Sequence, residues 1–164
     1  MGNDLAARII KRSEIHGEFV LSSGDRSTVY FDKFRFLGDP VMLREVASAV
    51  RQLLPDEATH LASPEGAATL LLAAVGLETG MPMAVVRKEP KAYGTKAQVE
   101  GHTPGGARVA LIEDVSTTGK QTLRAARALE ACGCEIAMIA LVIDRGGATA
   151  LREAGYAVES IASV

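Results

Sequence analysis

Two uninterrupted apolar segments constrain the fold of this chain more than any other feature. Residues 109–112 (VALI) and 136–143 (IAMIALVI) contain only apolar side chains and have the length of strands. Strands that are apolar on both faces are typical of parallel sheets, because helices cover both faces of such sheets. Segments with helical spacing lie between and around them. The sequence therefore predicts an α/β fold with a central, mostly parallel sheet flanked by helices.

The remaining elements follow from turn residues and apolar periodicity. One helix is expected to begin at Asp39-Pro40, with Asp as its N-cap and Pro in its first turn, and to end at Pro55. The first 38 residues do not follow the strand–helix alternation, so we expect a small N-terminal subdomain over one end of the sheet. The other expected helices cover residues 4–16, 66–79, 122–131 and 148–154, and the other expected strands cover residues 18–21, 29–32, 59–62, 83–86 and 156–161.

Length and composition exclude several classes of protein. A chain of 164 residues is expected to form one domain, residues 1–164. Eighteen basic and 20 acidic residues give a net charge of −2, which is no signature of a nucleic-acid-binding protein. No apolar run approaches the roughly 20 residues that a membrane span needs, and the N-terminus lacks the apolar region of a signal peptide. We therefore expect a cytoplasmic protein that binds neither nucleic acid nor membranes.

Residues that commonly bind metals are few and scattered. Cys132 and Cys134 are the only cysteines, and their C-x-C spacing matches neither a redox motif nor a zinc half-site. The histidines, at positions 16, 60 and 102, lack the spacing of a metal-binding helix. We therefore expect no metal that is ligated directly by the protein.

The stretch VALIEDVSTTGKQT, residues 109–122, is the most informative motif for function. Glu113 and Asp114 come at the carboxyl end of an expected strand, where open α/β sheets bind ligands, so we expect both carboxylates to point into a crevice. Residues 115–119 then form a turn of small side chains before a helix, whose N-terminus favours an anion. The turn suits a phosphate, whereas the acids suit sugar hydroxyls or a hydrated cation. A ribose 5-phosphate satisfies both requirements.

Two other interpretations of this motif fit less well. A Walker A motif needs glycine at position 114 and Ser or Thr at position 121, where this chain has Asp114 and Gln121. A loop that only caps the following helix would explain the hydroxyl groups. It would leave two adjacent acids at the end of a buried strand without any compensating contact, which is costly.

The motif resembles the phosphoribosyl pyrophosphate (PRPP) motif of type I phosphoribosyltransferases. Other segments resemble those of the orotate phosphoribosyltransferase family, in the same order along the chain. FVLSSGDRSTVYFD resembles the hairpin over the base, VVRKEPKAYG the mobile catalytic loop, and VIDRGG the strand end that reaches the base. The resemblance implies a type I phosphoribosyltransferase-like fold, with residues 1–38 as an N-terminal hood, residues 39–164 as the PRPP-binding core and residues 87–108 as the mobile catalytic loop.

The resemblance also implies an activity and its partners. The expected enzyme is a Mg²⁺-dependent orotate phosphoribosyltransferase of pyrimidine (UMP) biosynthesis, which transfers ribose 5-phosphate from PRPP to orotate. Its products are pyrophosphate and orotidine 5′-monophosphate. Mg²⁺ would be bound through PRPP and water. A homodimer is expected, in which residues 87–96 of one subunit reach into the neighbouring site.

Roles for individual residues come from the same resemblance. Glu113 and Asp114 would hold the ribose diol and stabilise positive charge on the sugar, and Lys91 would meet the departing pyrophosphate; these are the expected catalytic residues. The residues implied in PRPP binding are Arg87, Lys88, Lys91, Glu113, Asp114, Val115, Ser116, Thr117, Thr118 and Gly119. Those implied in base binding are Arg145, whose planar guanidinium would pair with the orotate carboxylate, and Thr117, Tyr30 and Phe31.

Simpler explanations remain open for some of these residues. The basic run RKEPKAYGTK has the composition of a solvated surface loop, although a net-acidic protein needs local positive charge for a substrate as anionic as PRPP. Arg145 could be a surface arginine beside a helix-starting Asp144. Tyr30 and Phe31 could be plain core aromatics.

The sequence departs from the family pattern at three places. Tyr93 stands where the catalytic loop usually carries His, Ser22 where many members carry Lys, and residues 63–68 lack the usual glycine pair or acid. Two alternatives therefore stay open: a PRPP-binding paralogue that acts on another base, and a non-catalytic PRPP- or nucleotide-sensing regulator on the same fold. Lys91 favours the enzyme, because a sensor has no leaving group to stabilise.

Overall fold

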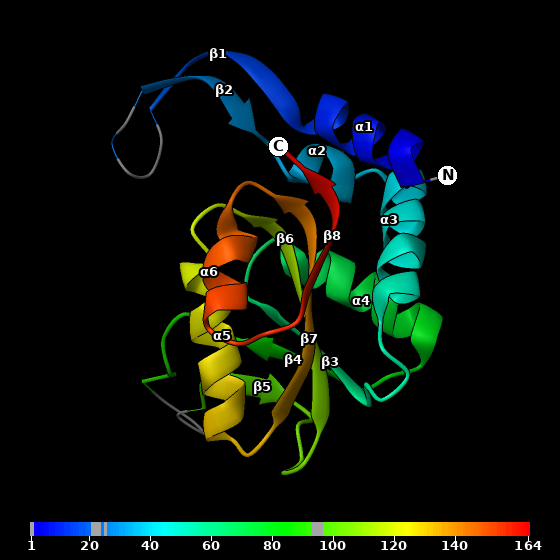
Figure 1. Ribbon diagram of the computed structural model, residues 1–164, viewed down its shortest axis with the longest axis vertical. Coiled ribbons are helices and arrows are strands. Elements are labelled where there is room, and N and C mark those ends of the chain that lie inside the picture. Colours follow the sequence, from blue (N-terminus) through cyan, green and yellow to red (C-terminus); the bar gives the residue numbers. More distant parts are fainter. Residues whose placement is uncertain (1, 21–23, 25, 93–96) are drawn as a thin grey trace.

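A six-stranded sheet forms the centre of the protein (Figure 1). The computed structural model describes residues 2–20, 24, 26–92 and 97–164. The strands of the sheet are β3 (His60–Pro64), β4 (Met83–Val86), β5 (Val99–Gly101), β6 (Arg108–Ser116), β7 (Glu135–Asp144) and β8 (Val158–Ser163). Their order is β5-β4-β3-β6-β7-β8, and all neighbours run parallel except β5, which is antiparallel to β4. The predicted mostly parallel sheet is confirmed.

Helices cover both faces of this sheet (Figure 1). One face carries α1 (Gly2–Ser13), α3 (Pro40–Leu53) and α4 (Ala68–Thr79), and the other carries α5 (Lys120–Ala131) and α6 (Gly147–Glu153). Ile112 is fully buried in the first core, and its neighbour Leu111 is fully buried in the second. Because successive residues of a strand point to opposite faces, the apolar run of β6 contributes to both cores.

The start of α3 agrees with the prediction from Asp39-Pro40. The Oδ1 atom of Asp39 accepts hydrogen bonds from the backbone N–H groups of Val41 (3.0 Å) and Met42 (3.3 Å), and Pro40 is the first helical residue. The helix ends at Leu53, shortly before Pro55. The side-chain cap and the proline are local signals, which is why the sequence was sufficient here.

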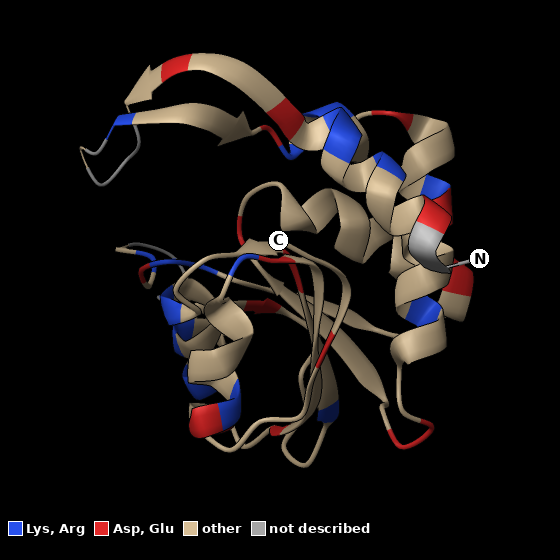
Figure 2. Cartoon of the chain, turned by 45° about the horizontal axis from the view of Figure 1, so that its top comes forward, with Lys and Arg blue, Asp and Glu red and all other residues tan. Residues whose placement is uncertain are grey.

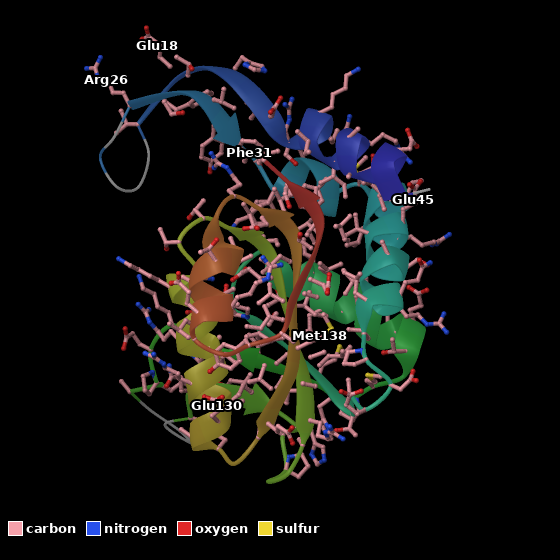
Figure 3. The ribbon with its side chains drawn as sticks, in the orientation of Figure 1. Glu18, Arg26, Phe31, Glu45, Glu130 and Met138 are labelled. Atoms are coloured by element: carbon pink, nitrogen blue, oxygen red, sulfur yellow. The ribbon has the colours of Figure 1, made fainter. Side chains whose placement is uncertain are left out.

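The N-terminal segment forms a second, smaller sheet beside the first one. Strands β1 (Glu14–Val20) and β2 (Arg26–Phe31) pair antiparallel, and a single turn of helix, α2 (Phe34–Leu37), leads from them towards α3. The hairpin extends beyond the body of the protein, with Glu18 and Arg26 at its far end (Figure 3). It starts next to the edge of the six-stranded sheet at which the parallel strands end (Figure 1).

Several local expectations are wrong. The first helix ends at Ser13 rather than at residue 16, because Glu14 to His16 pair with β2 and their ladder hydrogen bonds replace helical ones. Strand β5 lies inside the polar stretch 87–108, where its three residues pair with the exposed edge of β4. The helical turn α2 was not predicted either. Leu21, the expected end of the first strand, lies outside the described residues.

None of the helices in the part of the chain that the structure describes combines the length and the apolar character that crossing a bilayer requires.

Candidate active site

A cavity of about 390 Å³ opens at the carboxyl ends of the central strands. The chain leaves β3 towards β4 on one side and leaves β6 towards β7 on the other, so β3 and β6 form the switch point at which α/β sheets bind ligands. The cavity is lined from the ends of three strands, from α5 and from the segment after β2. The lining residues are Lys33, Pro64, Glu65, Val86, Arg87, Lys88, Glu113, residues 115–122, Arg124 and Ala125.

The structure brings part of the predicted site together in this cavity. Arg87, Lys88, Glu113 and all of residues 115–119 line it. The other predicted site residues that the structure describes do not line it: Lys91, Asp114, Arg145, Tyr30 and Phe31.

Residues 115–119, here called the phosphate loop, connect β6 to α5. Gly119 has a φ of 72°, and a Cβ atom at this position would lie 2.8 Å from the carbonyl oxygen of Gly147, so the backbone is packed directly against α6. Gly119, the N-cap residue of α5, has no side chain to cap the helix, and the hydroxyl of Thr118 accepts a long hydrogen bond from the N–H of Lys120 (3.4 Å). Ser116 is 3% exposed, and its hydroxyl has no hydrogen-bond partner among the described residues. A helix N-terminus that lacks a cap from its own N-cap residue, beside an unpartnered buried hydroxyl, suits an anionic ligand.

The two acids are buried within β6, which runs on to Ser116 instead of ending at residue 112. The structure differs from the expectation that both carboxylates point into one crevice. Adjacent residues of a strand point to opposite faces, so Glu113 lines the cavity while Asp114 meets Lys33, which follows the N-terminal hairpin. The Nζ atom of Lys33 lies 3.4 Å from Oδ1 of Asp114. The hydroxyl of Thr122 donates a hydrogen bond to Glu113 (3.2 Å).

The two carboxyl groups therefore have different environments. Burial, and then the charge of Asp114, raise the pKa of Glu113 to about 8, although Lys33 partly opposes this shift. At neutral pH Glu113 is then mostly protonated and can donate a hydrogen bond. Asp114, which is 1% exposed, has a lysine as ion-pair partner and its own backbone neighbour, the N–H of Val115, as donor (2.6 Å). One acid is suited to donate and the other to accept.

Residues 87–91, here called the basic segment, begin at the end of β4. The backbone N–H of Lys88 donates to Oε1 of Glu65 (2.7 Å), which joins the ends of β3 and β4. Gln98 donates a side-chain hydrogen bond to the carbonyl of Arg87 (3.2 Å). The Nε atom of Arg87 is buried without a hydrogen-bond partner among the described residues. A guanidinium with an unused donor in a cavity is suited to an anionic ligand.

Lys91 does not reach the cavity of its own chain. Its Nζ atom lies 2.5 Å from Oε1 of Glu100, on the edge strand β5. Both side chains are about one third exposed or less. Tyr93 and Gly94, which belong to the expected catalytic loop, lie outside the described residues, as does Ser22 of the hairpin.

Arg145 lies between the phosphate loop and the hairpin. Its backbone N–H donates to the carbonyl of Ser116 (2.8 Å), and its guanidinium carbon lies 4.2 Å from the centre of the Phe31 ring, a cation–π contact. Phe31 is at the base of the hairpin, next to the sheet (Figure 3). Arg145 is exposed, but it connects the phosphate loop, which is predicted to bind PRPP, with the hairpin, which is predicted to cover the base.

Asp144 and Tyr30, the neighbours of Arg145 and Phe31 in sequence, have simpler surroundings. Asp144 accepts hydrogen bonds from the N–H groups of Gly146 (2.9 Å) and Ala148 (3.1 Å), so it does cap the start of α6. Tyr30 is 44% exposed and stacks at a tilt on Phe19, with 5.6 Å between the ring centres. Tyr30 is therefore not a core aromatic.

Sequence reasoning missed four charged cavity residues: Lys33, Glu65, Lys120 and Arg124. The sequence did contain a signal for Lys120 and Arg124. Lys120 directly follows the Thr-Thr-Gly run, and Arg124 comes four residues later, which is the spacing of one helix face. Glu65 lies within residues 63–68, which the resemblance marked only as a departure from the family pattern. Lys33 had no signal, since it reaches the cavity only through the packing of the hairpin.

Comparison with known proteins identifies the family. The family model for the phosphoribosyl transferase domain matches residues 38–161. The orotate phosphoribosyltransferase of Thermococcus gammatolerans is 42% identical over 147 residues, which cover 87% of this chain and 78% of that protein.

Solved structures agree with this assignment. The orotate phosphoribosyltransferase of Mycobacterium tuberculosis, in complex with PRPP, matches with a TM-score of 0.81 and 26% identity, over 99% of this chain and 95% of that one. UMP synthase from Leishmania donovani matches with a TM-score of 0.82 and 27% identity over 98% of this chain, which spans only 36% of that longer protein. The chain therefore belongs to the orotate phosphoribosyltransferase family, the pentosyltransferases of pyrimidine biosynthesis.

Proposed function

We propose that this orotate phosphoribosyltransferase uses the cavity between β3 and β6 to transfer ribose 5-phosphate from PRPP to orotate, releasing pyrophosphate and orotidine 5′-monophosphate. The observation that carries the proposal is that the phosphate loop, Glu113 and the cations Arg87 and Lys88 line one cavity. PRPP has a phosphate at one end, a ribose in the middle and a pyrophosphate at the other end, which matches these groups. The PRPP complex of a related enzyme supports the choice of donor.

The phosphate loop would bind the 5′-phosphate through backbone N–H groups and hydroxyls. Glu113 would contact the ribose hydroxyls as a donor. Asp114 does not line the cavity but is paired with Lys33, which does, so it would have to turn from that pair to accept from the ribose. Positive charge develops on the sugar as the bond from its anomeric carbon to pyrophosphate breaks. A buried carboxylate close to this charge stabilises it. A ring nitrogen of orotate then forms the new bond on the opposite face of the sugar, so the anomeric carbon is inverted.

The basic segment would receive the pyrophosphate, with Arg87 and Lys88 beside it and Lys91 arriving when the loop closes. Among the described residues, no group of three His, Cys, Asp or Glu side chains is arranged to hold a metal ion. We therefore propose that Mg²⁺ is held by oxygen atoms of PRPP and by water. When bound, it would neutralise charge on the leaving pyrophosphate.

We propose a homodimer in which the loop of residues 87–96 contributes Lys91 to the neighbouring subunit's site, while Arg87 and Lys88 at its start line the cavity of their own chain. Lys91 is paired with Glu100 and does not line the cavity of its own chain. Helix α4 leads into β4, from which the basic segment starts, and it leaves Leu70 and Leu77 exposed, the latter at 87%. Apolar side chains exposed on a helix next to a functional loop suit contact with a second subunit.

Subunit exchange tests this dimer. Lys91→Ala and Asp114→Asn should each be nearly inactive, whereas a mixture that exchanges subunits should recover about a quarter of the wild-type activity, because half of the dimers are mixed and each has one intact site. Activity that stays at the level of the separate mutants, with exchange verified by mass, would show that Lys91 serves its own subunit.

We further propose that Arg145 binds the carboxylate of orotate, with Tyr30, Phe31 and Thr117 around the base, and that the enzyme is cytoplasmic. A spectrophotometric assay with PRPP and Mg²⁺ tests both the reaction and the base. Orotate should be consumed, and uracil should be refused by orders of magnitude, because without a carboxylate Arg145 faces no partner. Equal use of the two bases, or unchanged orotate use in Arg145→Ala, would contradict this role. No turnover with orotate would contradict the proposed reaction.

A further inference from the structure

We propose that Lys120 and Arg124 of α5 bind the 5′-phosphate of PRPP, so that side-chain cations as well as the phosphate loop hold this group. The inference rests on the proposed function of the cavity, because it names further ligands for the same substrate. It differs from the roles above in assigning the phosphate to a helix face and not to a loop alone.

The first argument is position. Lys120 directly follows the phosphate loop, Arg124 lies one helical turn later, and both line the cavity. Side chains of a helix lean towards its N-terminus, so the Arg124 guanidinium is directed back over the turn that begins at Lys120. Arg127, the next arginine of α5, does not line the cavity. The helix thus offers two cations to the cavity and keeps a third away from it.

The second argument is charge. Among the described residues, no carboxylate lies within 4.0 Å of either Lys120 or Arg124, whereas Lys33 and Lys91 both have ion-pair partners. Basic residues gather on α5 and on the segment beside it (Figure 2). Cations without internal partners at a concave site attract an anion.

The third argument is the unused hydroxyl of Ser116. Ser116 lines the cavity, and its hydroxyl is buried beside Gly147 without a hydrogen-bond partner among the described residues. Leaving a buried hydroxyl unpaired is unfavourable, so a ligand atom is expected there. A phosphate oxygen at Ser116 would lie at the start of α5. Charge-assisted hydrogen bonds from a lysine and an arginine on that helix would then complete its contacts.

The phosphate bound here is the 5′-phosphate and not the pyrophosphate. Lys120 is continuous with the phosphate loop, whereas Arg87 and Lys88 come from the end of β4, two strands away from β6 in the sheet. The two anionic ends of PRPP would therefore each have their own pair of cations.

The test uses the full chain and two probes, ribose 5-phosphate and inorganic pyrophosphate, with binding measured by calorimetry. Lys120→Ala and Arg124→Ala should each weaken ribose 5-phosphate binding about tenfold, the usual scale for one charged hydrogen bond. Pyrophosphate binding should change less than about twofold, since removing a cation at the far end leaves only a screened effect. Lys120→Arg should retain most of the affinity.

Arg127→Ala is the matched control, because it removes the same charge from the same helix outside the cavity, and it should bind both probes like the wild type. Unchanged ribose 5-phosphate binding in Lys120→Ala and Arg124→Ala would overturn the inference while leaving the proposed function intact. The inference would also be overturned if the two variants weakened the binding of pyrophosphate instead of ribose 5-phosphate, since both residues would then serve the leaving group. A wild-type protein that binds neither PRPP nor ribose 5-phosphate would contradict the proposed function itself.

Discussion

The phosphate loop and the basic segment line the same cavity but are built in opposite ways. The phosphate loop continues the buried strand β6, and its backbone is packed against Gly147. The basic segment follows the short strand β4, and side chains hold it in place: Glu65 accepts from the N–H of Lys88, and Glu100 pairs with Lys91. One end of the cavity is therefore formed by fixed backbone. The other end is formed by a segment that side-chain contacts hold, and its lysine Lys91 is paired with Glu100 outside the cavity.

This contrast fits the two halves of the proposed reaction. The 5′-phosphate stays bound while the bond at the anomeric carbon changes, so donors that are fixed in advance lose little conformational freedom. Pyrophosphate has to be met and then released, which requires contacts that can be exchanged as a loop opens and closes. We infer that the rigid part of the site binds the 5′-phosphate, which is retained, and that the part with exchangeable ion pairs binds the pyrophosphate, which leaves.

The largest effect is expected at Asp114, in the rigid half. Asp114→Asn should keep the fold but lower turnover by about a hundredfold or more, the scale of losing a key electrostatic contact at the reacting centre. The measurement is kcat for orotate, with circular dichroism as the control for folding. Near-normal turnover in a well-folded variant would remove the proposed role of this carboxylate.

A matched pair of glycines separates backbone strain from close packing. Gly119 and Gly80 have the same φ of 72°, but a Cβ atom would meet the carbonyl of Gly147 at 2.8 Å only in the first case. Alanine at Gly80 should lower the free energy of unfolding by about 1 kcal/mol, and alanine at Gly119 should lower it further because of the backbone clash. Gly119→Ala should in addition weaken PRPP binding about tenfold or more, since it displaces the phosphate loop. Equal PRPP affinity in both variants would mean that the loop is not rigidly required.

The buried Glu113 makes stability depend on pH. Its pKa rises from 4.5 to about 8 on folding, so the folded protein holds a proton that the unfolded chain has released. The stabilisation is complete below about pH 4.5 and is lost as pH rises towards 8. Between pH 5 and pH 8, unfolding by urea should show the wild type losing at least about 1 kcal/mol more than Glu113→Gln. Parallel curves for the two proteins would contradict the protonated state.

The smallest effect is expected in the exchangeable half. Glu100→Gln frees Lys91 from a partly exposed ion pair, which is worth less than about 1 kcal/mol. The KM for PRPP should therefore fall about two- to threefold, because Lys91 no longer has to leave a carboxylate. Steady-state kinetics of Glu100→Gln and of the wild type measure the KM for PRPP. A tenfold loss of activity would show instead that Glu100 holds Lys91 in its working position.

The features that could be predicted are those whose interactions are local. The apolar runs of β6 and β7, the cap at Asp39-Pro40 and the phosphate loop each lie within one short stretch of sequence. The opposite directions of Glu113 and Asp114 were also within reach, because adjacent residues of a strand alternate between its faces. The apolar run ends at Ile112, and a strand that ends there does not include the two acids, so the run alone does not predict their opposite directions.

The alternation of strands and helices and the loop that follows β6 can be derived from the sequence, since neighbouring residues supply the hydrogen bonds and the apolar faces of these elements. Which side chains meet at the end of β6 depends on how distant elements pack. Lys33 reaches Asp114 from 81 positions away, and β5 exists because β4 offers it an unpaired edge. The physical reason is that such pairs depend on how separate elements pack, and no periodicity within either element records its partner.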